Sequence, residues 1–342
     1  MDKKSPIPVL TCALVKSTTL IGTTLDDFTI VPFEGKGKGE FLVPHKKALD
    51  VLMGEKGPLT IECLETGSEK DKNLARKVKF TVGAVELEFD TQSQANFPQI
   101  PEPGKTTLAL DGETVKTLTD RTRFAVSAEA SRYTLQATLV KVVNGKTVMV
   151  ATDGHRLSYV TGPSEGKLKD TLIRPATMDW VRKNCSDKIA VGADENFITI
   201  CTGNGTIIAK KQSGQFPNYE AVMPTKNGIA LGFASADHFS NILKRIAKCA
   251  DERSRAIRLK VTDDSVTISA SSLENGSAKA DVQCSISGLN GHPVEIGFCA
   301  DYILDFLNVV KKGEFKIALK DSQSAGLFEV DNFKHVVMPM RI

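Results

Sequence analysis

The sequence predicts an α+β fold, rich in sheet, in which one structural unit occurs three times. A proline-containing segment recurs at 97–100 (FPQI), at 216–219 (FPNY) and, more loosely, at 337–340 (VMPM), and its prolines are 119 and then 122 residues apart. Each copy closes a similar series of an amphipathic helix, two strands joined by a turn, and a polar segment. We therefore expect three domains, at residues 1–104, 105–228 and 229–342.

The elements of the three units follow one plan. Helices with 3.6-residue periodicity are expected at 44–52, 175–183 and 300–310, and 48–52 (ALDVL) closely resembles 303–307 (ILDFL). Runs typical of strands follow each helix, at 58–63, at 188–191 with 197–201, and at 314–319 with 326–330. Upstream of the helices, 10–15 (LTCALV) matches 135–140 (LQATLV) in register, and 257–261 supplies the third copy.

A further helix opens units two and three, at 112–124 and 236–249, but not unit one. By repeat logic its counterpart would precede Met1, so we expect the first domain to be truncated at its N-terminus and the true start to lie upstream. The alternative is that residues 46–52 and a partner chain cover the first sheet.

Composition limits the class of protein. Hydrophobic residues make up 41% and charged residues 25% of the 342 positions, and the net charge of +3 is too small for nucleic-acid binding by overall attraction. The seven cysteines are odd in number and show no C-x-x-C spacing, so we expect neither a disulfide framework nor a metal, and no cofactor. Reduced thiols and the lack of an apolar run of 18 residues predict a cytoplasmic protein without a membrane span.

The stretch 152–157 (TDGHRL) directly follows a strongly β-like run, 147–151, and is expected to form a turn that presents side chains. Asp153 and His155 could form a general-base pair of a hydrolytic enzyme. On a strand, however, side chains at i and i+2 lie about 7 Å apart rather than in hydrogen-bond contact, and no nucleophile or metal-ligand pattern accompanies them.

Four motifs carry a resemblance that runs from end to end: 132–133 (RY), 151–157 (ATDGHRL), 214–219 (GQFPNY) and 336–342 (VVMPMRI). In order and spacing they are similar to those of the bacterial DNA polymerase III beta subunit family, the DNA sliding clamps. The resemblance implies a homodimeric, head-to-tail ring of three like-folded domains per chain, with helices inside facing duplex DNA and sheets outside. It also implies an accessory subunit without catalysis, which tethers the polymerase III catalytic subunit, the clamp loader and other clamp-binding-motif proteins.

The C-terminus suggests a binding surface by itself. Five of its last seven residues are Val, Met or Ile, which must either dock or bind. Val336 and Val337 are equally consistent with a last core strand, whereas flexible Met338 and Met340 suit several partners, and Pro339 is expected to end strand pairing.

The resemblance implies a groove for extended client peptides. Its residues would be Leu135, Thr152, Gly154, His155, Arg156, Leu157, Pro217, Val222, Val336, Val337, Met338, Pro339, Met340 and Arg341. Ala221, Gln323 and Ala325 depart from residues common in the family, so client preference is expected to differ.

Positive residues gather on the candidate channel helices, where weak, sequence-independent phosphate contacts would permit sliding. Each cluster could equally be a solvated helix face, but several equivalent clusters favour a channel. The resemblance adds Lys4, Arg132 and Tyr133 at the rim. The expected DNA contacts are Lys4, Lys46, Lys47, Lys116, Arg121, Arg123, Arg132, Tyr133, Lys244 and Arg245.

Residues 85–90 (VELEFD) alternate between an apolar and an acidic face, and such a strand edge invites pairing. By resemblance, Leu87 and Phe89 would pack against the partner's third domain near Lys248 and Cys249. Because the latter two positions are commonly apolar in the family, we expect a looser interface that leans on charge and is weakened by salt.

Two alternatives remain open beside the clamp interpretation. One is the hydrolytic enzyme described above. The other is a peptide-binding scaffold that never meets DNA, or an accessory paralogue that serves as such a scaffold in repair. Neither the enzyme nor the scaffold accounts for three repeats.

Overall fold

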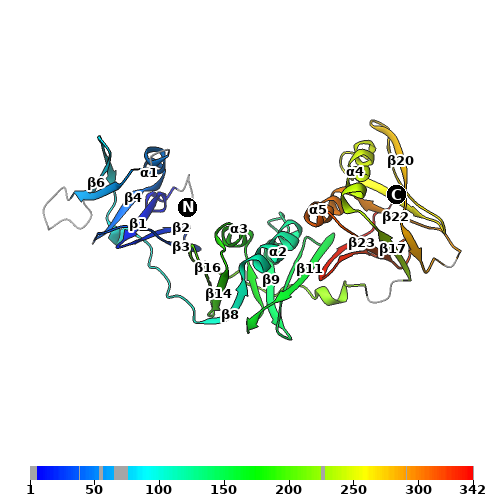
Figure 1. The fold of residues 1–342 in the computed structure, drawn as a ribbon, viewed down its shortest axis with the longest axis horizontal. Helices are drawn as coiled ribbons and strands as arrows, with labels where there is room; N and C mark the ends of the chain where they lie inside the picture. Colours follow the sequence, from blue (N-terminus) through cyan, green and yellow to red (C-terminus); the bar gives the residue numbers. More distant parts are fainter. Residues whose placement is uncertain are drawn as a thin grey trace. The chain divides into compact units, whose positions relative to one another are not determined.

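The computed structural model describes residues 6–37, 39–53, 57–64, 76–224, 228–289 and 291–341. Sheets predominate and few helices accompany them (Figure 1), which confirms the predicted α+β class. Contacts divide the chain into two compact units, residues 1–112 with 183–211 and residues 113–182 with 212–342. The three domain limits expected from the repeat stay a prediction.

The first unit contains a large antiparallel sheet with the strand order β8-β14-β15-β16-β3-β2-β1-β4. A smaller sheet has the order β5-β6-β7, so that β5 and β7 are its edges. The strands are β1 (Cys12–Lys16), β2 (Thr19–Thr23), β3 (Asp27–Pro32), β4 (Glu40–Pro44), β5 (Leu59–Leu64), β6 (Arg76–Val82), β7 (Val85–Thr91), β8 (Thr106–Asp111), β14 (Lys188–Ala193), β15 (Phe197–Thr202) and β16 (Gly205–Lys210). Helix α1 (His45–Leu52) follows β4 directly, and its buried Ala48 packs in a cluster with Val15, Val43, Val78 and Phe80.

The second unit contains an antiparallel sheet with the order β13-β9-β10-β11-β25-β24-β23-β17-β21 and a four-stranded sheet with the order β20-β19-β18-β22. The strands are β9 (Thr138–Val143), β10 (Lys146–Thr152), β11 (Arg156–Pro163), β13 (Thr171–Ile173), β17 (Ile229–Phe233), β18 (Ala256–Val261), β19 (Val266–Ser272), β20 (Gly276–Val282), β21 (Ser285–Ser287), β22 (Val294–Cys299), β23 (Phe315–Leu319), β24 (Gly326–Val330) and β25 (Phe333–Val337). The short strand β12 is Glu165–Gly166.

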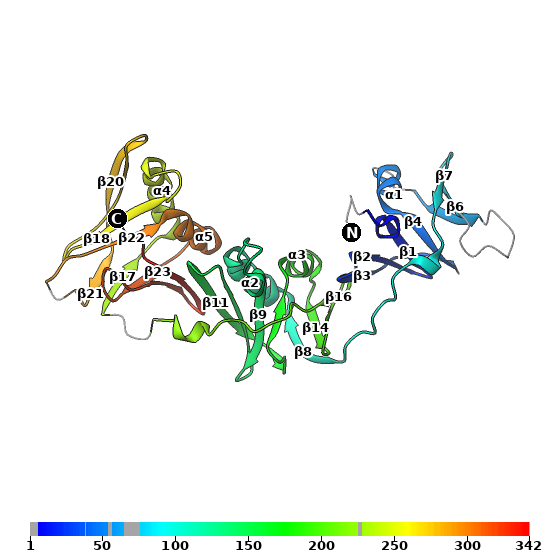
Figure 2. The same cartoon turned by 180° about the vertical axis from the view of Figure 1, so that it is seen from behind.

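Four helices accompany these sheets: α2 (Gly112–Thr122), α3 (Pro175–Asn184), α4 (Ala236–Ile246) and α5 (Ala300–Val310). Helices α4 and α5 lie side by side in both views (Figures 1 and 2). Helix α5 buries Ala300, Ile303, Phe306 and Leu307, which recur at helical spacing. Outside this buried face, Asp301 pairs with Arg255 and Asp305 pairs with Arg156.

The helices predicted from periodicity are present with ends within one or two residues. The helices predicted at 112–124 and 236–249 continue beyond α2 and α4 as the 3-10 turns η3 (Arg123–Ala125) and η6 (Ala247–Cys249).

The strands predicted at 10–15 and 135–140 begin later than expected. In each case the first residues form a 3-10 turn, η1 (Pro8–Thr11) or η4 (Tyr133–Gln136). Leu10 and Leu135, which match in the repeat, are both buried from these turns. The register of the repeat therefore holds, but the matched leucines pack from a turn and not from a strand.

Candidate functional site

The segment between β10 and β11 is a tight turn held by its own polar groups. Thr152 pairs with Leu157 across the hairpin, and Gly154 has a φ of +91°, which favours glycine. The Thr152 hydroxyl accepts a bond from the Gly154 amide at 3.1 Å and donates to the Arg156 carbonyl at 2.6 Å. The turn leaves His155 exposed and Leu157 buried, so it presents the imidazole to solvent.

The Asp153 carboxylate belongs to this turn. Its Oδ1 accepts from the amides of His155 at 2.9 Å and Arg156 at 3.0 Å, and its Oδ2 accepts from Nε of Arg156 at 3.0 Å. The His155 ring instead stacks on Tyr302, with centroids 6.4 Å apart and an interplanar angle of 19°. These contacts give Asp153 a structural role and give no support to a general-base pair.

Arg156 is the most heavily engaged side chain of the predicted site, and only 11% of it is exposed. Besides Asp153, its guanidinium donates to Asp305 of α5 and, at 2.8 Å, to the carbonyl of Phe124. Its Cζ atom lies 4.5 Å from the ring centroid of Tyr302 and 5.4 Å from that of Phe124. Its planar donors therefore face protein partners and not open solvent.

The C-terminal segment joins the turn through strand pairing. Strand β25 lies between β11 and β24, with Val337 opposite Arg156, and both Val336 and Val337 are buried. This confirms their core position. Beyond the strand, the amide of Met338 donates to the carbonyl of His155 at 2.9 Å.

Strand β25 ends at Val337, two residues before Pro339, in agreement with the expectation that this proline ends the strand. Beyond the proline, the amide of Met340 donates to the Gly297 carbonyl at 2.8 Å and forms an isolated bridge to β22, since proline removes a donor only at its own position. Met338 is exposed, Pro339 and Met340 are half-buried, and Arg341 is exposed. The methionines thus remain accessible while the backbone beside them is fixed.

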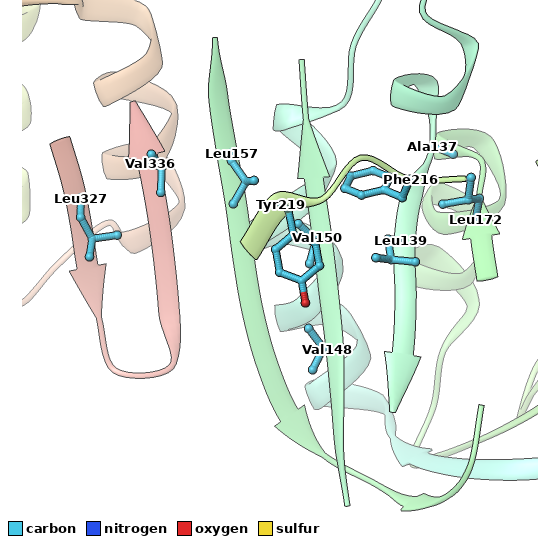
Figure 3. Packing of buried hydrophobic residues seen from close by; sticks show 10 residues of the cluster. All are labelled: Ala137, Leu139, Val148, Val150, Leu157, Leu172, Phe216, Tyr219, Leu327 and Val336. Carbon is cyan, nitrogen blue, oxygen red and sulfur yellow. The ribbon is translucent and has the colours of Figure 1, made fainter. Parts of the chain in front are cut away.

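The proline-containing segment 214–219 supplies an aromatic cover. Figure 3 shows Phe216 and Tyr219 lying over the strands that carry Leu139, Val150 and Leu157. Both rings are buried, and they meet edge to face with centroids 6.5 Å apart. Helix α2 covers the opposite face of the same sheet near Gly162, which explains why five consecutive residues of β10 are buried.

The structure therefore brings together the turn, the C-terminal segment and the aromatic cover. Leu157 and Val336 share one buried cluster with Phe216 and Tyr219. Leu135 is buried, whereas Pro217 and Val222 are exposed neighbours of the aromatic residues.

The predicted site leaves out the packing residues Leu139, Leu172, Phe216 and Tyr219. The recurring FPxx segment is the sequence signal for the two aromatic residues, although the predicted site includes only Pro217 and Val222 from this region.

Burial shifts the pKa of two groups near the site. It raises the pKa of Tyr219, against which Lys141 acts in the opposite direction from 5.2 Å above the ring. It lowers the pKa of fully buried His335 to about 3, with Arg156 adding to the effect. The His335 ring bonds Ser158 through Nδ1 at 2.9 Å and the Tyr302 carbonyl through Nε2 at 3.2 Å. His335 is therefore neutral at pH 7 and links β11, β25 and α5.

The predicted DNA contacts divide into two groups. Those on α2 and η3 have partners within the chain: Lys116 bonds Glu113 at 2.6 Å, Arg121 bonds Asn332 at 2.8 Å, and Arg123 holds both oxygens of Asp179. On α4, Lys244 and Arg245 are exposed, and neither is ion-paired with another described residue. Helix α4 thus offers the more available positive charge.

The remaining predicted DNA contacts differ in whether their side chains are exposed or bound to other residues. Lys46 and Lys47 are exposed on α1, and the ammonium of Lys47 lies 5.6 Å from the Phe89 ring centroid. Arg132 is tied to Glu129 at 3.0 Å and to the Asp153 carbonyl at 3.2 Å, and Tyr133 is half-exposed. Lys4 lies outside the described residues.

Strand β7 carries the predicted interface residues. Leu87 and Phe89 are half-buried against the chain's own core, and Phe89 meets Phe80 edge to face at 5.6 Å, while Val85 is 54% exposed. Its acidic face is partly neutralised by β6, because Lys79 pairs with Glu86 at 2.9 Å and Lys77 with Glu88 at 3.8 Å. On η6, Lys248 is exposed and Cys249 is half-buried.

Within the described part of the chain, no helix combines the length and the apolar character that crossing a membrane requires. The same residues contain no group of three or more His, Cys, Asp or Glu side chains arranged to hold a metal ion.

Comparisons with known proteins cover the whole chain. Residues 109–218 match the family described as DNA polymerase III beta subunit, central domain, and residues 220–341 match its C-terminal domain. The beta sliding clamp of Pseudomonas aeruginosa is 28% identical over 100% of this chain and 95% of the relative, and that of Chlamydia pneumoniae is 25% identical over 100% and 94%. A crystal structure of the P. aeruginosa DNA polymerase III subunit beta aligns with a TM-score of 0.88 at 26% identity, covering 98% of this chain and 94% of that one.

Proposed function

The chain belongs to the DNA polymerase III beta subunit family, and on that premise we propose that it is a DNA sliding clamp. It would encircle duplex DNA as a homodimeric ring in the cytoplasm and hold the replicative polymerase at its template. Its contribution would be tethering, as an accessory subunit without chemistry of its own. The observation that carries the proposal is the match of two successive domains of one family across residues 109–218 and 220–341.

Client recognition is assigned to the surface formed by the turn 152–157, the segment 338–341 that follows β25, and the segment 214–222. Its supporting features are an immobile apolar floor and accessible methionines beside it. Leu157 and Val336 are buried in one cluster, whereas Met338 and Met340 are accessible from a backbone fixed to His155 and Gly297. A rigid apolar surface with polarizable side chains at its edge suits extended peptides of several sequences.

The test of the clamp itself is topological. The chain is loaded by a clamp loader onto a nicked circular plasmid, and the circle is then cut once. A clamp stays bound to the closed circle and is lost from the cut molecule, because it holds DNA by enclosure and not by affinity. Equal retention on both, or no retention on either, would refute the proposal, and the latter would favour the peptide-binding scaffold.

The test of the client site uses a fluorescein-labelled peptide carrying the clamp-binding motif of the polymerase III catalytic subunit. Met340→Ala or deletion of residues 338–342 is expected to weaken binding by about 2 kcal/mol or more, as truncation of a central anchor does. Both changes lie beyond β25 and leave its pairing intact. Leu273→Ala, at a fully exposed leucine, is the matched control. Unchanged affinity for the peptide after the deletion would refute the assignment of this surface as the client site.

A further inference from the structure

We propose that helix α5 sets the position of the client-binding turn, with Asp305 and Tyr302 as positioning residues that act through Arg156. The inference rests on the proposed function, because it assigns a role to residues behind the client site. Neither Asp305 nor Tyr302 belongs to the predicted client site.

Arg156 is the residue through which α5 can hold the turn in place. Its Nε is bound to Asp153 within the turn, while its terminal nitrogens reach Asp305 and the Phe124 carbonyl outside it. The guanidinium also contacts two aromatic rings, of which Tyr302 is the nearer at 4.5 Å. A planar group held by three hydrogen-bond partners and by contacts with two rings keeps one orientation. Asp153 is bonded to this group, so the position of the turn is fixed with it.

The same face of α5 also contacts the exposed tip of the turn. The His155 ring lies parallel to Tyr302, and the His155 carbonyl receives the Met338 amide. Tyr302 thus contacts two consecutive residues of the turn, His155 and Arg156, and the first of them is bonded to Met338 in the C-terminal segment. A displacement of Tyr302 or Asp305 would reach both sides of the client site.

Asp305 and Tyr302 are fixed on a rigid helix. Their neighbours Ile303, Phe306 and Leu307 are almost fully buried, so α5 cannot rotate to follow a mobile turn. Arg156 and Asp305 are 149 residues apart in sequence, and their contact is therefore a tertiary constraint on a surface turn. Preorganisation of this kind raises affinity by reducing the ordering needed on binding.

Helix α5 also provides a matched control. Asp301 forms a comparable pair with Arg255, with Nε to Oδ distances of 3.2 and 3.3 Å, and Arg255 also bonds the Ala247 carbonyl at 2.9 Å. Asp301→Asn therefore removes one Arg–Asp pair from the same helix without touching Arg156. Comparing it with Asp305→Asn separates positioning of the turn from general stabilisation of α5.

The experiment measures the affinity of the full-length chain for the labelled clamp-binding-motif peptide, together with its melting temperature. Asp305→Asn is expected to weaken peptide binding about fivefold or more, since a charge-assisted bond that orients Arg156 is lost. Asp301→Asn should leave affinity unchanged even if it lowers the melting temperature equally. Tyr302→Phe, which keeps the ring, should bind more tightly than Tyr302→Leu, which does not.

A double variant tests whether the effect passes through Arg156. Arg156→Met alone should weaken binding, and adding Asp305→Asn should weaken it little further, because both changes break the same connection. Full additivity, or equal loss from Asp301→Asn and Asp305→Asn, would overturn the inference while leaving the clamp proposal intact. Absence of peptide binding by the wild-type chain would instead count against the proposed client site.

Discussion

Single residues in the predicted site have roles that differ from their first interpretation. Asp153 and Arg156 lie three positions apart in a motif that resembles a binding or catalytic signature, yet their polar atoms bond each other, the turn backbone and α5. His335, which no motif singled out, lies fully buried among Phe124, Phe306, Phe328 and Phe333. For these side chains, the hydrogen-bond and packing partners determine the role more than the residue type does.

The buried imidazole of His335 makes stability depend on pH. In the unfolded chain this group takes up a proton near pH 6.5, whereas in the folded chain its pKa is lowered to about 3 by burial. Between these values the unfolded state binds more protons, so stability is fully present above about pH 6.5 and is lost as the pH falls towards 3. The expected loss is on the order of a few kcal/mol.

His335→Gln, which stays neutral, should flatten this dependence. Melting temperatures at pH 7, 5 and 4 provide the measurement, and the difference in slope between wild type and variant isolates His335 from the carboxylates. Parallel slopes for the two proteins would contradict the prediction.

Among the elements, β7 is the predicted contact between two chains. It is an edge strand of the small sheet, and an unpaired edge with apolar residues favours association. Leu87 and Phe89 already pack partly on the chain's own core, and Glu86 and Glu88 already pair with lysines of β6. Part of the apolar stripe and part of the acidic face are therefore already engaged within the chain, and Val85 is the most exposed of the three apolar side chains of the stripe.

Leu87→Asp is expected to convert the proposed dimer into monomers at micromolar concentration, because a carboxylate would be buried without a partner. Sedimentation velocity provides the measurement. Leu59→Asp, at a partly exposed leucine on the opposite edge strand β5, should remain dimeric. A monomeric wild-type chain at ordinary salt would argue against the interface, as would a Leu87→Asp chain that still sediments as a dimer.

For the whole molecule, the distribution of paired and available charges matters more than the net charge of +3. A ring that slides needs weak contacts with phosphates, and cations already bound to carboxylates contribute little to them. Arg123 is held by Asp179 and Lys116 by Glu113, whereas Lys244 and Arg245 on α4 are exposed. We therefore assign the main phosphate contacts to α4.

The double variant Lys244→Glu with Arg245→Glu should weaken binding to a labelled duplex and reduce the slope of log affinity against log salt by about 2. Fluorescence anisotropy at several salt concentrations measures both quantities. Lys316→Glu with Lys320→Glu makes the same change in net charge at two exposed lysines in and beside β23 and should keep the wild-type slope. If the two double variants behave alike, the effect belongs to net charge and not to α4.

The sequence by itself determined the elements and their order. Helical periodicity located α1, α3 and α5 to within one or two residues, and the recurring proline segment revealed the repeat. These features are local, since a helix or strand pattern is a property of neighbouring residues. The motifs likewise identified the turn and the C-terminal segment as members of one site.

Only the tertiary structure decided which of those side chains are available. The partners of Arg156 come from η3 and α5, those of Arg123 from α3, and those of His335 from β11 and α5. Nothing in the local pattern of a cation or a histidine reveals a carboxylate or a hydroxyl that packing brings to it from more than a hundred positions away. For the same reason the sequence could place Phe216 and Tyr219 beside a proline but could not show that they cover the sheet, because that contact exists only once β9, β10 and β11 have paired.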